Sequence, residues 1–405
     1  MSNPSNYRGV HLTNFIAKVA EKMIARHLIR FFERSNAYGW YQFGFRAGHS
    51  CKDLVTLLVY KWLWALQMDQ KIAIYLSDIS GAFDRVDRNI LCSKLRGLGV
   101  PEPLVAFLFS CLASRRGKIV VQGSDSDVFA IANQVFQGTV LGPPLWAVFF
   151  KSVDIPIATC EFESVKFADD LTVHRSFASD TPDIVVKEKL RSVQECVHSW
   201  GKRNRAVFDA AKEHFCVIHR TLHNGDTFRL LGTLIDPKLT MADEIDRIPK
   251  QTKAKCKAIL GRRTYYDIHS MIQQFKTHVL CILEGSNGAI YHAALSNLQI
   301  LDNIQDGFIR ELSVSRSVAF LRYNMAPLQL RRDIGILGLL HEVQLGQAQF
   351  AFNEIFPAAD YSCLKSTRHN VRRHNKQFAE FHGCTDYLII PFLLPCVCTM
   401  CFQRK

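Results

Sequence analysis

Hydrophobic and polar residues follow helical spacing at the start of the chain and then strand spacing. Between residues 13 and 34, apolar pairs recur about every four residues and alternate with lysines and arginines. This pattern predicts an amphipathic helix with one basic face, capped by Thr13. Residues 71–78 alternate apolar side chains and end at an aspartate, which predicts a strand.

The same criteria predict the remaining elements. Helices are expected at 87–98, at 103–115, after Pro143 and Pro144, and from about 180 to 200 with Asp180 or Thr181 as cap. Strands are expected in a hairpin at 117–122 and 128–135, in a strand–turn–strand unit at 164–174, and at 214–219 and 228–235. After residue 240 the pattern is mainly helical.

Composition indicates a folded, basic protein. The chain has 405 residues, of which 48% are hydrophobic and 21% charged, which is enough for two or three domains. A net charge of +13 suits a polyanionic partner, either nucleic acid or an anionic membrane.

The cysteines and the apolar runs bear on location. The 13 cysteines are an odd number and mostly stand singly in apolar runs, which indicates reduced thiols in an intracellular protein, in the nucleus, the cytoplasm or both. The N-terminal residues lack a signal-peptide pattern. The uncharged run at 387–402 is too short, at 16 residues, for a membrane-spanning helix, so no membrane partner is expected.

Two acidic sites stand at the ends of apolar strands. Asp78 ends one strand, and Asp169 and Asp170 lie in the turn of the strand–turn–strand unit. Carboxylates in such places are costly unless something compensates their charge. A pair of Mg²⁺ ions would do so, whereas an isolated Asp-Asp is more often ordinary turn chemistry.

Other segments of the chain favour the metal site over ordinary turn chemistry. In order along the chain, seven segments resemble the successive motifs of reverse transcriptases from non-LTR (LINE-type) retrotransposons. They are 7–28, 42–55, 76–91, 135–150, 165–173, 200–215 and 228–241. Seven ordered motifs are far more specific than any one of them.

This resemblance implies a catalytic set. Asp78 and Asp169 match the two metal-binding aspartates, and Asp170 matches the second acid of the same turn. Lys212 matches the lysine that protonates the leaving pyrophosphate. The implied cofactor is a pair of Mg²⁺ ions, with Mn²⁺ as a substitute.

The resemblance also implies contacts to nucleotide and primer. Arg46 matches the arginine that clamps the triphosphate, and Phe83 matches the bulky ring that excludes a 2′-hydroxyl. Two further pairs are implied: Gln137 and Gly138 against the incoming nucleotide and template, and Leu231 and Gly232 in the hairpin that grips the primer end.

The implied fold is α+β, a right-hand polymerase with fingers, a palm of antiparallel sheet plus helices, and a helical thumb. We expect fingers at 1–70, palm at 71–239 with an inserted fingers segment near 112–135, thumb at 240–350, and a basic, cysteine-containing tail at 351–405. Residues 247–280 hold eight lysines and arginines against one acid, which suits phosphate contacts by the thumb. Cys398 and Cys401 form one Cys-x2-Cys pair without a partner pair, which leaves zinc binding open.

The predicted function is RNA-directed DNA polymerase, with RNA template, DNA primer and deoxynucleotides as partners. Because the chain begins at the fingers, we expect no endonuclease of its own and a separate one as partner. Two alternatives remain. One is an RNA-dependent RNA polymerase, against which Phe83 and the alanine before Asp169 argue; the other is an inactive relic that at most binds RNA.

Overall fold

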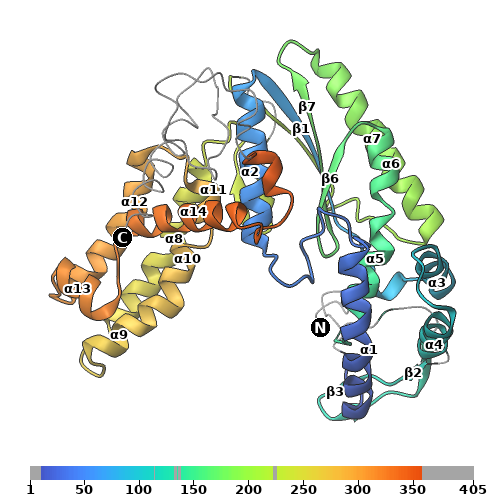
Figure 1. Cartoon of the computed structure of the whole chain (residues 1–405). Coiled ribbons are helices and arrows are strands. Elements are labelled where there is room, and N and C mark those ends of the chain that lie inside the picture. Colours follow the sequence, from blue (N-terminus) through green and yellow to red (C-terminus); the bar gives the residue numbers. More distant parts are fainter. Residues whose placement is uncertain (1–10, 114, 132–134, 136–137, 222–225, 358–405) are drawn as a thin grey trace, which may run out of the picture. The chain divides into compact units, whose positions relative to one another are not determined.

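The computed structural model describes residues 11–113, 115–131, 135, 138–221 and 226–357 (Figure 1). The chain divides into two compact units, each with its own core. The first unit takes in the described residues of 1–49, 74–175 and 181–215. The second takes in those of 50–73, 176–180 and 216–405.

The first unit combines a sheet with helices. Its helices are α1 (Phe15–Arg34), the 3-10 helix η2 (Ala82–Arg85), α3 (Arg88–Gly97), α4 (Glu102–Leu112), α5 (Gly142–Lys151), α6 (Asp154–Thr159) and α7 (Asp183–Asn204). Its strands are β1 (Gln70–Ser77), β2 (Arg115–Gly117), β3 (Val120–Val121), β4 (Ser124–Asp125), β5 (Phe129–Ile131), β6 (Glu163–Phe167), β7 (Asp170–Ala178) and β8 (His214–Ile218). Strand β1 begins, and β7 and β8 end, in segments assigned to the second unit.

Four of these strands form the sheet on which the predicted acids lie. Their order is β6-β7-β1-β8, so β1 is internal and pairs with β7 and β8. Ile72 and Ile74 of β1 are fully buried, and so are Ala73 and Tyr75, which point to the opposite face, so the strand is covered on both faces. Strands β6 and β7 are antiparallel, and Phe167 pairs with Asp170, which leaves residues 168–169 as a two-residue turn.

Large aromatic side chains fill the space between the helices of this unit. Trp146 of α5 stacks on Phe149 and Phe150 at 5.8 and 5.3 Å, and Phe150 lies 5.6 Å from Trp200 of α7. Each of these rings is almost completely buried. Burial of an aromatic side chain contributes roughly 2–3 kcal/mol, so this cluster fixes α5 against α7.

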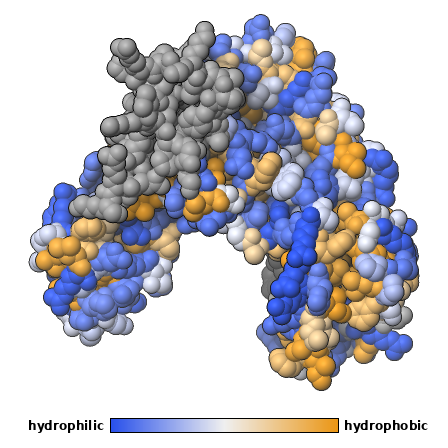
Figure 2. Space-filling view, in the orientation of Figure 1, coloured by the Kyte–Doolittle hydropathy of each residue, from blue (hydrophilic) through white to orange (hydrophobic). Residues whose placement is uncertain are grey.

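A short β-ribbon in the first unit exposes apolar side chains. Strand β2 pairs with β5, and β3 pairs with β4 around Gln122 and Gly123. Figure 2 shows hydrophobic side chains at the surface here; the exposed ones are Ile119, Val120, Val121, Val128 and Phe129.

The second unit is mainly helical. Its elements are α2 (Cys51–Gln67), the hairpin β9 (Phe228–Leu230) and β10 (Thr233–Ile235), α8 (Ala242–Leu260), α9 (Ile268–Phe275), the π-helix η3 (Lys276–Leu280), α10 (Cys281–Leu283), α11 (Asn287–Ile290), α12 (Leu295–Glu311), α13 (Arg316–Tyr323), α14 (Leu328–Gln344) and α15 (Phe352–Ile355). Helices α8 and α12 pack together, and α11 packs on α2.

Most predicted elements agree with the structure. However, α2 was not predicted, and α5 begins at Gly142, before the two prolines rather than after them. Other details also differ. Asn14, not Thr13, caps α1 by accepting from the amide of Ile16. Helix α7 begins at Asp183 without a side-chain cap. Arg115 belongs to β2 rather than to a helix. Residues 228–235 form the hairpin that the family resemblance implied, rather than the single strand that the residue pattern predicted, because they turn back at residues 231–232.

Two further observations concern the described residues. No helix among them is long and apolar enough to cross a lipid bilayer. The eight cysteines in these segments are free thiols. The C-terminal cysteines, His382 and the basic stretch 361–376 lie outside the described residues, as does Gln137.

Candidate active site

Asp78 lies where β1 ends, beside the segment that carries Lys212. Ile79 forms an isolated antiparallel bridge with Phe208, and the carbonyl of Asp78 accepts from the amide of Asp209 at 3.0 Å. This pairing places Lys212 Nζ 2.5 Å from Asp78 Oδ2 and 3.7 Å from Asp209 Oδ2. Two predicted catalytic residues, 134 positions apart, are therefore in direct contact.

Asp169 lies in the two-residue turn between β6 and β7, Asp170 is the first residue of β7, and β7 is the neighbour of β1. Partial burial of its carboxyl and, to a lesser extent, the negative charges of Asp169 and Asp78 together raise the pKa of Asp170 to about 6, although Lys212 opposes them. Asp78 directly follows β1, and Asp170 is the first residue of the neighbouring strand β7. The structure thus brings together the acids that the sequence singled out.

The turn itself has an unusual backbone. Ala168 has a φ of +59°, the left-handed region that two-residue hairpin turns usually fill with glycine. Gln42 and Trp146 both donate to the carbonyl of Ala168, and Gln42 also accepts from its amide. The backbone next to Asp169 is therefore fixed by side chains from outside the turn.

Phe83, the predicted sugar gate, lies in η2 and is only 7% exposed. Its ring centroid is 5.8 Å from Phe45 in an edge-to-face arrangement and 5.9 Å from Trp146. Rings packed on two sides have little freedom to move. Phe83 thus has the fixed position that a steric gate needs.

Arg46, the predicted triphosphate clamp, is engaged with protein groups. Its guanidinium donates to both carboxylate oxygens of Glu33, at 3.0 and 2.5 Å, and to the carbonyls of Gly39 and Gln42. The side chain is 8% exposed. In this arrangement Arg46 holds the 39–46 segment together, and its contact with a nucleotide stays a prediction.

Gly138 and the two predicted primer-grip residues all have positive φ angles. Gly138 has a φ of +88°, and a Cβ there would come within 3.0 Å of the carbonyl of His11. Leu231 (φ +47°) and Gly232 (φ +92°) form the tip of the β9–β10 hairpin in the second unit. Both predicted pairs therefore include a glycine that the backbone requires.

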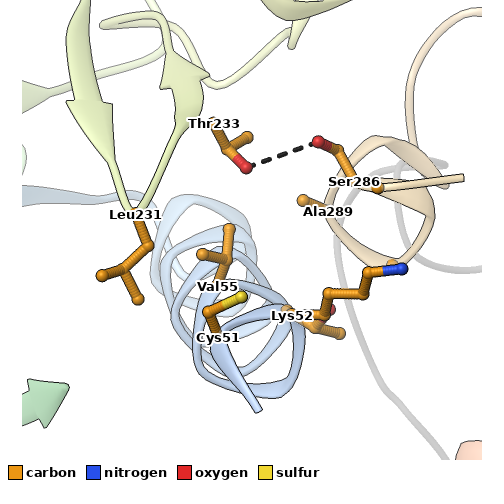
Figure 3. Close-up of a pocket in the computed structure, with 10 residues that line it drawn as sticks. Cys51, Lys52, Val55, Leu231, Thr233, Ser286 and Ala289 are labelled. Atoms are coloured by element: carbon orange, nitrogen blue, oxygen red, sulfur yellow. Dashed lines mark hydrogen bonds between the residues drawn. The ribbon is translucent and has the colours of Figure 1, made fainter. Parts of the chain in front are cut away.

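The hairpin tip borders a small cavity in the second unit (Figure 3). Leu231 and Thr233 from the hairpin face α2 and the start of α11, where Thr233 and Ser286 share a hydrogen bond of 3.4 Å. The volume is about 30 Å³, room for about one water molecule. This cavity cannot hold a nucleotide.

The donor set of the candidate site suits a hard divalent cation. Among the residues that the structure describes, no three His, Cys, Asp or Glu side chains are arranged closely enough to enclose a metal ion. Nevertheless, three carboxylates supply the hard oxygen atoms that Mg²⁺ prefers, and the raised pKa of Asp170 reflects burial together with negative charge that a cation would neutralise. The residues present therefore fit this cofactor by their chemistry.

The raised pKa of Asp170, caused by burial and by the neighbouring acids, predicts a pH-dependent gain in stability for Asp170→Asn in metal-free buffer. An acid whose pKa is raised in the folded state lowers stability as pH rises from about 4 to about 6 and above. The variant should match the wild type at pH 4 and be more stable above pH 6, by at most ~1 kcal/mol because the side chain is exposed and solvent screens the repulsion. Urea unfolding at both pH values measures this; an equal or lower stability of the variant at pH 7 would contradict it.

Three residues that support the candidate site were given no role from the sequence. Gln42 and Trp146 lie inside motif segments but had no role there, and Glu33 was not connected with Arg46. Gln42 could have been noticed as an amide side chain between two aromatic residues, Tyr41 and Phe43. Trp146 gave no signal beyond that of a core helix.

Comparison with known proteins supports the family resemblance that the sequence motifs indicated. Residues 2–235 match the family described as "Reverse transcriptase (RNA-dependent DNA polymerase)". The chain is 28% identical over 267 residues to the RNA-directed DNA polymerase from mobile element jockey of Drosophila melanogaster, covering 62% of this chain and 29% of that protein. It is 34% identical over 156 residues to the probable RNA-directed DNA polymerase from transposon BS of the same species, covering 38% and 17%.

These matches confirm the resemblance to reverse transcriptases of non-LTR retrotransposons and the α+β polymerase fold that it implied. Among solved structures, apo telomerase from Candida tropicalis aligns with a TM-score of 0.43 and 11% identity, over 84% of this chain and 56% of that one. The chain spans about 29% of the length of the jockey protein, so the expectation about an endonuclease stays a prediction.

Proposed function

Because this chain belongs to the reverse transcriptase (RNA-dependent DNA polymerase) family, we propose that it adds deoxynucleotides to a DNA primer on an RNA template. The observation that supports this most is the meeting of Asp78, Lys212 and the 169–170 turn at one place in the first unit. The predicted names fingers, palm and thumb, and the intracellular location, stay predictions.

In the proposed reaction, Asp78, Asp169 and Asp170 hold the divalent cations. When bound, Mg²⁺ or Mn²⁺ would polarise the phosphate oxygens and lower the pKa of the attacking 3′-hydroxyl. The acids' own contribution is position. Asp78 directly follows β1, and Asp169 and Asp170 stand at the start of the neighbouring strand β7, so the sheet keeps the three acids in one region of the first unit.

Lys212 is proposed to supply a proton to the leaving pyrophosphate. Its ammonium group lies against Asp78 Oδ2, which keeps the proton-bearing nitrogen beside the acids. The side chain is 53% exposed, so Nζ can also reach toward solvent and substrate. A positioned proton donor typically contributes a factor on the order of 10²–10⁴ to the rate.

Phe83 is proposed to select deoxynucleotides. A ring held between Phe45 and Trp146 cannot turn aside for a 2′-hydroxyl. Selection then works by exclusion rather than by contact with the accepted sugar.

Basic side chains in each unit support a nucleic-acid partner. In the first unit, Lys22, Arg26 and Arg30 of α1 are exposed. In the second, α8 exposes Lys253, Lys255 and Lys257, and the segment after it exposes Arg262, Arg263 and Tyr265, whose ring is 85% exposed. Such groups bind phosphates without reading sequence, and an exposed aromatic ring can stack on a base.

The test is primer extension by the purified chain on an RNA template with Mg²⁺. We expect full-length DNA from deoxynucleotides, none with EDTA, and little product from ribonucleotides. Equal use of ribonucleotides would favour an RNA-dependent RNA polymerase instead. Binding of the template and primer without any extension would favour an inactive relic.

A further inference from the structure

We propose that Gln42, together with Trp146, is a positioning residue for the catalytic turn, acting on the backbone of Ala168 next to Asp169. This inference rests on the proposed function, since it concerns how the same acids are held in place. Neither side chain needs to touch the substrate.

The contacts of Gln42 match both polar groups of one residue. Its Nε2 donates to the carbonyl of Ala168 at 3.2 Å, and its Oε1 accepts from the amide of Ala168 at 3.0 Å. Oε1 also accepts from the amide of Gly44 at 2.9 Å. A single side-chain amide therefore satisfies the donor and the acceptor of Ala168 from 126 positions away in the chain.

Ala168 needs such support because its backbone is strained. A non-glycine residue in the left-handed region costs roughly 1–2 kcal/mol, and hydrogen bonds from outside the turn can offset that cost. Asp169 follows directly, so a change in the Ala168 dihedrals would swing its carboxylate. Strict positioning matters here, since a misplacement of about 1 Å can cost a factor on the order of 10² in rate.

Gln42 is itself held rigidly. It is completely buried, and the segment around it pairs with β6. The amide of Phe43 donates to the backbone carbonyl of Lys166, and the amide of Lys166 donates to the backbone carbonyl of Tyr41, both at 2.8 Å. Arg46, fixed by Glu33, donates to the carbonyl of Gln42 at 3.1 Å.

Gly44 brings this segment into contact with the turn. A Cβ at Gly44 would lie 2.1 Å from the amide nitrogen of Ala168, so only glycine permits this approach. The backbone of the 42–44 segment therefore packs directly against the catalytic turn.

Trp146 is the second donor. Its Nε1 donates to the same carbonyl of Ala168 at 3.2 Å, and its ring packs against Phe83. A carbonyl oxygen can accept two hydrogen bonds, so the two donors are compatible. Trp146 therefore connects the proposed sugar gate with the acidic turn.

The test compares Gln42→Met, Trp146→Phe and the double variant with the wild type. Gln42→Met should lower kcat by a factor on the order of 10–100 and leave the nucleotide KM within about threefold. Trp146→Phe keeps an aromatic ring and should cost less. In the double variant the buried carbonyl of Ala168 loses both donors, so its loss should exceed the product of the single losses.

Gln305→Met is the matched control. Gln305 is also buried (2% exposed) and donates to a backbone carbonyl, that of Ala326, but it lies in the second unit. It should lower thermal stability without lowering kcat of the folded protein. Equal losses of kcat in Gln42→Met and Gln305→Met, or strictly multiplicative losses in the double variant, would overturn the proposal.

Hydrogen exchange gives a readout that does not depend on activity. Amides of residues 166–171 should exchange faster in Gln42→Met or Trp146→Phe than in the wild type, and should be unchanged in Gln305→Met. If the wild type extends no primer, the proposed function fails while this measurement still tests the positioning role. Unchanged exchange in both variants would refute that role.

Discussion

Replacement of Asp78 or Asp169 by asparagine is expected to lower the rate of nucleotide addition by a factor on the order of 10³ or more. Asparagine keeps the size of the side chain but removes the charge that would hold a divalent cation. Single-turnover primer extension with saturating nucleotide measures the chemical step, and binding of the primer and template should change little.

Asp246→Asn is the control for this pair. Asp246 is an exposed acid on α8 that pairs with Lys250, a type of ion pair that contributes about 0–1 kcal/mol. Its replacement should leave the rate unchanged. A wild-type rate in Asp78→Asn would show that Asp78 has no part in the chemistry, however close it lies to Lys212.

Phe83→Val is expected to raise the use of ribonucleotides relative to deoxynucleotides by a factor on the order of 10². The smaller side chain leaves room for a 2′-hydroxyl that the ring excludes. The ratio of kcat/KM for matched nucleotides measures this change and is insensitive to a general loss of activity caused by repacking against Trp146.

Phe45→Leu serves as its control. Phe45 contacts Phe83 edge to face and is 49% exposed, and leucine at this position keeps an apolar side chain against the Phe83 ring. Its substitution should change sugar selectivity by less than about threefold. An unchanged ratio in Phe83→Val would show that discrimination between sugars arises elsewhere.

Local sequence patterns were sufficient for most secondary structure. Alternating apolar residues located β1, and the strand–turn–strand pattern of 164–174 placed Asp169 in the turn and Asp170 beside it. Caps were less predictable, because Thr13 and Asn14 are both good capping residues and only the backbone geometry decides which of them accepts the hydrogen bond.

Contacts between distant residues could not be predicted in the same way. The pairing of Asp78 with Lys212 followed from family resemblance and not from spacing. The hydrogen bonds from Gln42 to Ala168 had no local signal, since they depend on the 42–44 segment lying beside β6. The engagement of Arg46 by Glu33 depends likewise on how the loop after α1 folds back.

Titration with Mn²⁺, followed by electron paramagnetic resonance, can determine whether acids from separate strands hold one group of cations. We expect the wild type to bind Mn²⁺, and Asp78→Asn and Asp169→Asn each to weaken binding at least about tenfold, with Asp246→Asn unchanged. Full Mn²⁺ affinity in Asp78→Asn, alongside its loss in Asp169→Asn, would contradict a shared site.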